Sequence, residues 1–390
     1  MAEWLTTAEA LSRLGVRPQT LYAYVSRGRL EARPDSQDPR KSLYRADDVA
    51  RLCNRRSRGR KAALVAEDAI AWGEPVLASA ITTVSGGRLF YRGRDAIELA
   101  RTQTLESVAR WLRGHEGPSL RVRATPAGPP LNEAYARAFA VLAAQAAIQP
   151  PARGRAPKLL AAEAGGLLDA LADAVAGVET ETGTARTPPI HLRLAKAWGC
   201  DAAQAELIRM VLVLLADHEL NPSTFAARVA ASTGASLAAS ALAGLAALSG
   251  PLHGAMGARV LAFVDEAGRS SAGEAVSARL AQGLPIPGFG HPLYPSGDPR
   301  ARALLEVFTL PPAFEAVRLA AEAQTGEIAN VDYALTALTL ALGLPENAAF
   351  LMFAIGRCAG WLAHALEQVQ TGRVIRPRAR YVGPPGRIEV

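Results

Sequence analysis

The chain has 390 residues, of which 49% are hydrophobic and 20% charged, and its formal net charge is +7. This composition excludes a disordered chain and is typical of a globular protein of two or three domains. Three cysteines in no paired spacing argue against a disulfide framework or a zinc site. No apolar run reaches the roughly 20 residues of a membrane span, so we expect no membrane contact. The odd number and wide spacing of the cysteines favour a reducing compartment, so we expect a cytoplasmic protein.

The first 61 residues carry all of the excess positive charge. They contain 14 Lys and Arg against 7 Asp and Glu, whereas the other 329 residues are balanced at 29 against 29. The stretch LTTAEALSRLGVRPQTLYAYVSRGRLEA predicts two short helices joined at Gly15, with Thr6 or Thr7 and Glu9 at the start of the first. A short hairpin and the helix ADDVARLCNRRSR should follow.

Residues 4–57 resemble the winged helix-turn-helix of excisionase-like and MerR-like DNA-binding domains. The resemblance implies that the polar face of the second helix reads a DNA groove while basic residues meet phosphates. The implied DNA-contacting residues are Arg17, Gln19, Thr20, Tyr22 and Arg27. The alternative is a basic cap that only packs on its neighbour. The segment RRSRGRK (55–61) is predicted to be a linker.

From residue 62 the chain consists of segments rich in Ala and Leu between loops rich in Pro and Gly. The best strand candidate is a hairpin-like piece at 85–96. The hydrophobic periodicity predicts an all-α body. Helices are expected at 104–113, 132–148, 159–176, 202–216, 223–249, 255–267, 272–281, 300–308, 312–323, 332–343 and 346–368.

Several polar residues interrupt this apolar pattern, and most of them stand at helix ends or in stiff loops. Asp332 lies in a first helical turn, where the helix dipole favours a carboxylate, and Arg357 lies inside an apolar helix, which is costly unless it meets an anion. Histidines and a further arginine stand in Gly- and Pro-rich stretches such as PIPGFGHPLYPSGDPRAR (285–302). These residues are His218, His253, His291 and Arg300.

This set of residue types suits carbon–carbon bond formation at a thioester. Such a reaction needs a base, a hydrogen-bond donor for the enolate oxygen and a second donor for the electrophilic carbonyl. A small di- or tricarboxylate substrate needs arginines, because a guanidinium binds a carboxylate bidentately. Taken alone, however, Asp332 would be an ordinary acid at a helix N-terminus.

Blocks of the body resemble the citrate synthase family in order and spacing, over about residues 62–116 and 188–384. They are ADHELNPSTFAARVAASTGASLAASALAGLAALSGPLHG, GFGHPLYPSGDPRA, NVDYALTALTLALGLP and FAIGRCAGWLAHALEQ with RVIRPRARYVG. The implied fold is a two-domain helical one, with a large domain at 62–253 plus 341–390 and a small domain at 254–340. Residues 1–61 would form the preceding helix-turn-helix domain and linker.

The resemblance also implies the roles of single residues. Asp332 would abstract the α-proton of the acyl-CoA, His253 would bind the thioester oxygen, and His291 would polarise the ketone of oxaloacetate. The oxaloacetate carboxylates would be bound by His218, Arg300 and Arg357, and by Arg376 reaching the other subunit of a homodimer.

Three functions follow from these resemblances. The first is condensation of oxaloacetate with acetyl-CoA to citrate and CoA, without metal or resident cofactor. The second uses propionyl-CoA and makes 2-methylcitrate. The third is a DNA-binding regulator built on a citrate synthase body. The sequence departs from the family at Ala255–Gly257, Pro292 and Pro295, which lie in stretches expected near CoA.

Overall fold

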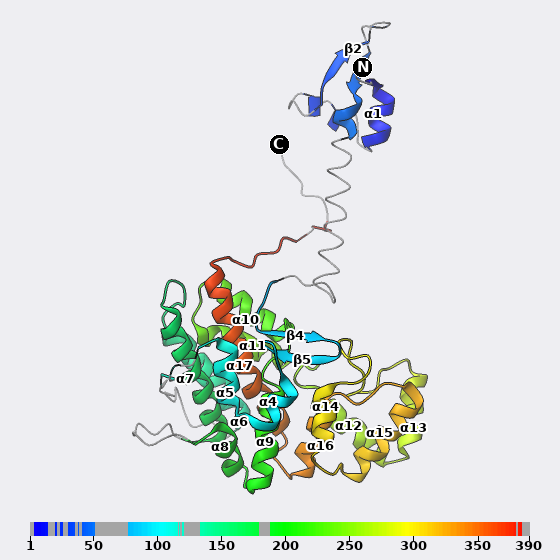
Figure 1. Ribbon diagram of the computed structural model, residues 1–390. Coiled ribbons are helices and arrows are strands. Elements are labelled where there is room, and N and C mark those ends of the chain that lie inside the picture. Colours follow the sequence, from blue (N-terminus) through cyan, green and yellow to red (C-terminus); the bar gives the residue numbers. More distant parts are fainter. Residues whose placement is uncertain are drawn as a thin grey trace. The chain divides into compact units, whose positions relative to one another are not determined.

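The computed structural model describes residues 4–14, 20–21, 24–25, 30–35, 38, 41–50, 77–115, 117, 119–120, 133–178, 188–379 and 381–383. The chain divides into two compact units, Met1–Ala78 and Ser79–Val390. Figure 1 shows both units. The predicted linker at 55–61 lies outside the described residues.

The N-terminal unit contains a three-stranded antiparallel sheet of order β1-β3-β2. Its elements are β1 (Trp4–Thr6), α1 (Thr7–Leu14), β2 (Ala32–Pro34) and β3 (Ser42–Arg45), and residues 46–50 are helical. Tyr44 is 1% exposed and pairs with Leu5 on one side and Ala32 on the other, so it anchors the small core.

The predicted start of the first helix is confirmed in detail. The Glu9 carboxylate accepts hydrogen bonds from the backbone N–H and the hydroxyl of Thr6, each at 2.8 Å, which is a capping-box arrangement. The predicted hairpin is formed by β2 and β3. Strand β1 was not predicted, because three residues are too few to show an alternating pattern.

The C-terminal unit is helical apart from one small antiparallel sheet, of order β4-β5-β6. The strands are β4 (Thr82–Ser85), β5 (Arg88–Tyr91) and β6 (Arg94–Asp95). The first helices are α4 (Ala96–Thr102), α5 (Leu105–Arg113), α6 (Ala134–Ile148), α7 (Pro157–Ala176), α8 (Ile190–Ala197), α9 (Ala202–Leu214), α10 (Pro222–Ser232) and α11 (Leu237–Leu248). They are followed by α12 (Met256–Gly268), α13 (Ala272–Ala281), α14 (Pro299–Leu305), α15 (Pro312–Thr325), α16 (Val331–Ala341) and α17 (Ala348–Thr371).

The all-α prediction for the body is confirmed, with one helix predicted wrongly. The span 223–249 forms two helices, α10 and α11, instead of one. Gly234 has a φ of +89°, and the hydroxyl of Ser236 caps the second helix by accepting from the N–H of Ala239. The short helices α4 and α8 were not predicted.

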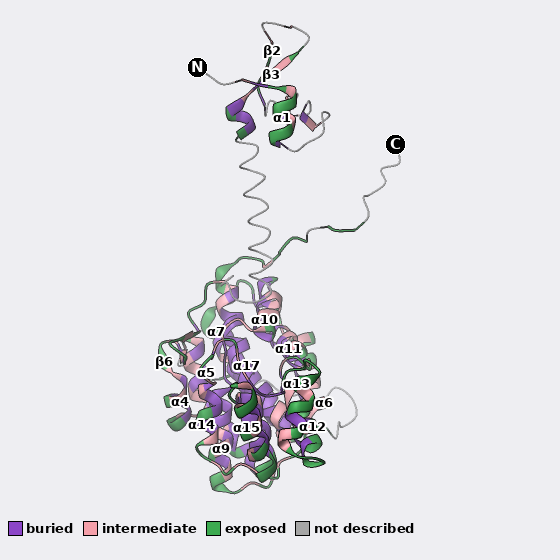
Figure 2. Cartoon of the chain, turned by 90° about the vertical axis from the view of Figure 1, so that its right-hand side faces the viewer, coloured by how far each residue is buried: buried purple, intermediate pink, exposed green. Residues whose placement is uncertain are grey.

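Two hydrophobic cores lie inside the C-terminal unit. The larger core gathers α4–α11 around α17, the most buried helix, and the smaller core gathers residues of α12, α13, α15 and α16 (Figures 1 and 2). One face of α16, with Leu335 and Leu338, belongs to the larger core, whereas Tyr333 and Ala337 belong to the smaller one. Helix α16 therefore joins the two. The bounds of the large and small domains stay a prediction.

Helix α17 is long and apolar enough to cross a membrane by length and composition, but 94% of its most apolar window is buried within the protein. Helices α5, α7, α9, α10 and α11 pack against it. Its apolar character is explained by this packing in the core.

Candidate active site

His218 stands in the turn that follows α9, and this turn is held by a buried tyrosine. The hydroxyl of Tyr91, on β5, lies 3.1–3.2 Å from the carbonyl oxygens of Val213, Leu214 and Asp217. The last carbonyls of a helix lack partners within it, so a buried hydroxyl at this position satisfies polar groups that would otherwise be unpaired.

The residues on either side of His218 are anchored to different elements. The Asp217 carboxylate accepts from Nε2 of His364 on α17 at 3.1 Å. The Glu219 carboxylate accepts from the N–H of Val84 on β4 at 2.7 Å. Glu219 has a φ of +52°, a left-handed conformation that a non-glycine residue adopts at a cost, so the turn is held by its surroundings.

His253 is held by the N-terminal turn of α10. Its Nε2 lies 2.9 Å from the hydroxyl oxygen of Ser223, which accepts from Nε1 of Trp361 at 3.1 Å and lies 2.7 Å from Oδ1 of Asn221. The serine has a single proton for two acceptors, Asn221 Oδ1 and His253 Nε2. The tautomer of His253 therefore depends on which of them receives it.

The loop 285–298 carries His291 and leads into α14, where Arg300 lies. The backbone N–H of Leu293 donates to Nδ1 of His291 at 3.2 Å, so the neutral ring carries its proton on Nε2. Asp298 caps α14 and binds Arg300 through both carboxylate oxygens, Oδ1 with Nε at 3.0 Å and Oδ2 with Nη2 at 2.8 Å. Arg300 is 2% exposed.

The same loop is joined to the start of α16, where Asp332 lies. Asn330 donates from its backbone N–H to the carbonyl of Gly288 and from its side chain to the carbonyl of Gly290 at 3.0 Å. The N–H of Val331 donates to Oδ2 of Asp298 at 3.1 Å. These bonds bring the segments of His291 and Asp332 side by side.

Asp332 itself is half-buried, and Asn330 caps its helix. Within the described part of the chain, no hydrogen bond to its carboxylate is found. Burial raises the pKa of Asp332 to about 6, although Arg300 and Arg357 act in the opposite direction. A carboxylate with this pKa is ionised at neutral pH and is basic enough to accept a proton.

Arg357 lies inside α17 at 1% exposure and contacts the end of α9. Its Nε donates to the carbonyl of Leu215 at 3.0 Å, and its guanidinium lies 4.8 Å from the ring centroid of Phe353. Burial lowers the pKa of Arg357 to about 10, which leaves it charged at neutral pH.

His218 contacts residues of the loop that carries His291. Its Nε2 lies 2.9 Å from the hydroxyl of Tyr294, and its ring lies edge-on to that of His291 with centroids 5.2 Å apart. Burial first, and then the charges of Arg300 and Arg357, hold the pKa of His218 well below its usual value. Burial likewise lowers the pKa values of His253 and His291 to about 4. All three rings are therefore neutral at neutral pH, in a site that carries two arginines.

The predicted site residues thus divide into two groups. The structure brings His218, His253, His291, Arg300, Asp332 and Arg357 together. Arg376 is exposed beyond the end of α17 and contacts none of these residues within the described chain. Of the five predicted DNA-contacting residues, only Thr20 is described, in a helical segment, while Arg17, Gln19, Tyr22 and Arg27 lie outside the described residues.

Sequence reasoning missed the residues that hold the site. Ser223, Tyr294 and Asp298 each bond directly to a predicted site residue. A signal existed for Asp298, because an acid before Pro299 is typical of a helix N-cap. None existed for Ser223 or Tyr294, whose partners lie 30 and 76 residues away along the chain.

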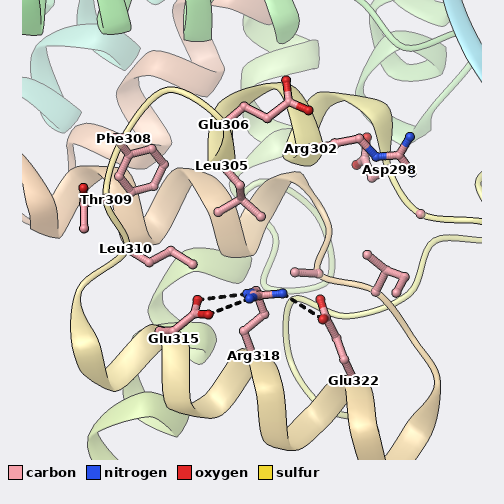
Figure 3. A pocket seen from close by; sticks show the side chains of 13 residues that line it. Asp298, Arg302, Leu305, Glu306, Phe308, Thr309, Leu310, Glu315, Arg318 and Glu322 are labelled. Carbon is pink, nitrogen blue, oxygen red and sulfur yellow. Dashed lines mark hydrogen bonds and ion pairs between the residues drawn. The ribbon is translucent and has the colours of Figure 1, made fainter.

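A cavity of about 520 Å³ is lined by residues of α14, of α15 and of the loop between them (Figure 3). Arg318 crosses it between two carboxylates, Glu315 at 2.6 Å and Glu322 at 2.9 Å, so its charge is already neutralised. Of the residues described above for the site, the cavity shares only Asp298. It is therefore separate from the cluster of histidines.

Comparisons with known proteins show what this chain is similar to. A profile of the citrate synthase C-terminal domain matches residues 129–378, and one of a helix-turn-helix domain matches residues 4–57. Citrate synthase 2 of Bacillus subtilis is 36% identical over 197 residues, which are 46% of this chain and 52% of that protein. The 2-methylcitrate synthase of Shewanella oneidensis is 30% identical over 218 residues, 53% of this chain and 58% of that protein.

In these alignments the chain spans about half the length of the curated relatives it matches. Among solved structures, citrate synthase from Thermotoga maritima superposes with a TM-score of 0.67 and 26% identity, covering 82% of this chain and 96% of that one. The profile match covers more than half of the chain, and the helical fold agrees with it. The chain belongs to the citrate synthase family, and a helix-turn-helix domain precedes its citrate synthase domain.

Proposed function

We propose that the C-terminal unit condenses oxaloacetate with acetyl-CoA to give citrate and free CoA. The observation that carries this proposal is a half-buried carboxylate, Asp332, with a pKa of about 6, bonded through its helix to the loop of a neutral histidine. Asp332 takes a proton from the methyl group of the acyl thioester, and the resulting enolate attacks the ketone carbon of oxaloacetate. Hydrolysis of the citryl thioester then releases CoA.

The histidines act as neutral hydrogen-bond donors in this proposal. His291 carries its proton on Nε2, because Nδ1 accepts from Leu293, and this proton polarises the ketone and then passes to the new alkoxide. For His253 to donate to the thioester oxygen from Nδ1, Ser223 must direct its own proton to Nε2. Arg300 and Arg357 bind the carboxylates of oxaloacetate, together with Arg376 of a second subunit in a homodimer.

The test is thiol release by the full chain supplied with oxaloacetate and either acetyl-CoA or propionyl-CoA. We expect turnover with acetyl-CoA and a loss of at least about 1,000-fold in Asp332→Asn, because an amide cannot accept the proton. Asp265→Asn, an exposed acid on α12, is the matched control and should behave like the parent. The proposal would be refuted if the parent protein showed no turnover, or if Asp332→Asn retained the turnover of the parent.

The choice between acetyl-CoA and propionyl-CoA depends on the pocket for the acyl chain. One methylene is worth about 1–3 kcal/mol in a hydrophobic pocket, so a preference for either thioester requires only a small difference in packing. The similarity to a 2-methylcitrate synthase favours including propionyl-CoA in the assay. A higher kcat/KM for propionyl-CoA would assign the chain to the second activity.

The second candidate function is DNA binding by the N-terminal unit. It is supported by the helix-turn-helix match and by the +7 charge carried by residues 1–61. Binding of the full chain to duplex DNA of mixed sequence should weaken steeply with salt. It should also weaken in Arg17→Gln and Arg27→Gln but not in Arg269→Gln, an exposed position on the catalytic unit. Equal binding by all three variants would exclude this interface.

A further inference from the structure

A buried chain of polar side chains runs from α10 through α17 to the turn of His218. Arg228 of α10 is 1% exposed and His364 of α17 is 1% exposed, and Asp217 is fully buried. Nη1 of Arg228 lies 3.0 Å from Nδ1 of His364, and Nε2 of His364 lies 3.1 Å from Oδ2 of Asp217. None of these three residues has a role in the proposed reaction.

The partners determine which nitrogen of His364 carries the proton. A guanidinium can only donate, so Nδ1 of His364 must accept from Arg228 and cannot be protonated without losing this bond. The proton of the neutral ring is then on Nε2, where it is donated to Asp217. Arg228 is itself held by Glu367 at 2.6 Å and by Gln368 at 3.1 Å, so the donor end of the chain is fixed.

The other end of this hydrogen-bonded series is Asp217, which lies next to the residues proposed to bind oxaloacetate. Burial alone would raise the pKa of Asp217, but the hydrogen bond from His364 and the charge of Arg357 hold it below its ordinary value. Asp217 is therefore an ionised carboxylate that interacts electrostatically with Arg357, and it immediately precedes His218. Gly360 allows α17 to come this close, since a Cβ there would lie 2.3 Å from Oδ1 of Asp217.

We propose that Arg228, His364 and Asp217 form a positioning relay for the oxaloacetate-binding side of the site. Arg228 holds His364 in the tautomer that donates from Nε2, and this hydrogen bond fixes the Asp217 carboxylate beside Arg357 and the backbone that carries His218. The inference rests on the proposed function, because it assigns oxaloacetate to these residues. All three are positioning residues and do not touch the substrate.

Two amide substitutions at one position test the relay. In His364→Gln the amide nitrogen reaches about as far as Nε2 and still donates to Asp217, whereas the side chain of His364→Asn is one carbon shorter and leaves Asp217 without this donor. We expect the KM for oxaloacetate to rise about tenfold in His364→Asn, the factor that one lost hydrogen bond to a charged group is worth. In His364→Gln it should stay within about threefold of the parent, and the KM for acyl-CoA should not change in either variant.

The relay is refuted if the two variants have the same KM for oxaloacetate, or if only the KM for acyl-CoA or kcat changes. A purely structural role would lower the folded fraction in both variants and leave the KM values of the folded enzyme unchanged, which also counts against it. Circular dichroism of each variant reports the folded fraction separately.

A second measurement tests the proposed hydrogen bonds of His364 and does not depend on enzyme activity. Nitrogen NMR of the full chain with isotope-labelled histidine reports the protonation of each ring nitrogen, and His364→Gln identifies the His364 signals among the six histidines. We expect a neutral ring with its proton on Nε2, and loss of this single state in Arg228→Met. A ring protonated on Nδ1 in the parent would overturn the relay. A parent that gives the expected spectrum but has no turnover would refute the proposed function alone.

Discussion

Replacing Asp332 by asparagine should stabilise the fold while abolishing the proposed reaction. The pKa of Asp332 is about 6 in the folded chain against an ordinary value of 3.8, because burial disfavours the ionised carboxylate. A difference of about 2 between the two pKa values corresponds to about 3 kcal/mol at roughly 1.4 kcal/mol for each pH unit. The free energy of unfolding is lower by this amount when Asp332 is ionised in the folded protein. An uncharged asparagine does not cause this loss.

The sign and the pH range follow from the two protonation equilibria. Below about pH 3.8 the carboxyl is protonated in both the folded and the unfolded chain, so Asp332→Asn should change stability little. Between about pH 4 and 6 only the unfolded chain is ionised, and the parent loses stability relative to the variant as the pH rises. Above pH 6 the difference should be constant.

The assay is urea unfolding of parent and Asp332→Asn at a series of pH values, with Asp265→Asn as the exposed control. Comparing variants at each pH cancels the titration of all other groups. The free energy of unfolding of Asp332→Asn should exceed that of the parent by up to about 3 kcal/mol at pH 8 and by little at pH 4. A pH-independent difference, or a variant less stable than the parent at pH 8, would show that Asp332 is not destabilised by burial and would remove the argument for its basicity.

Three further predictions concern the same unit. The rate of thiol release should fall about tenfold for each pH unit below about 6, because only ionised Asp332 accepts a proton, and a flat profile between pH 5 and 7 would contradict this. Tyr91→Phe removes the hydroxyl whose single proton is shared among three backbone carbonyls, so the free energy of unfolding should drop by about 1–3 kcal/mol, and an unchanged value would show that this hydrogen bond does not stabilise the turn. Gly360→Ala should cost about 1–3 kcal/mol, because its Cβ meets Asp217, whereas Gly268→Ala on α12, where a Cβ meets nothing within 4 Å, should be tolerated. Equal stability of the two alanine variants would refute the close approach of α17.

Local sequence determined much of this protein. The apolar periodicity predicted the helical body, the Thr6–Glu9 pair the start of α1, and the Pro- and Gly-rich stretch at 285–302 a loop that carries a histidine. These features depend on residues within a few positions of each other, where helix capping and backbone restrictions act. The types of the candidate site residues could be identified for the same reason, since polar groups in apolar segments are visible without a structure.

Only the tertiary structure decided how those residues are held. Asp217 and His364 lie 147 positions apart, yet they share a buried hydrogen bond, and Arg228 meets His364 across 136 positions. No local pattern predicts such pairs, because their strength comes from the low-dielectric interior that the packed helices create. The tautomers of the histidines and the raised pKa of Asp332 arise there as well. The sequence alone therefore supplied the chemical groups, and the packing of α10, α16 and α17 determined their protonation states and mutual positions.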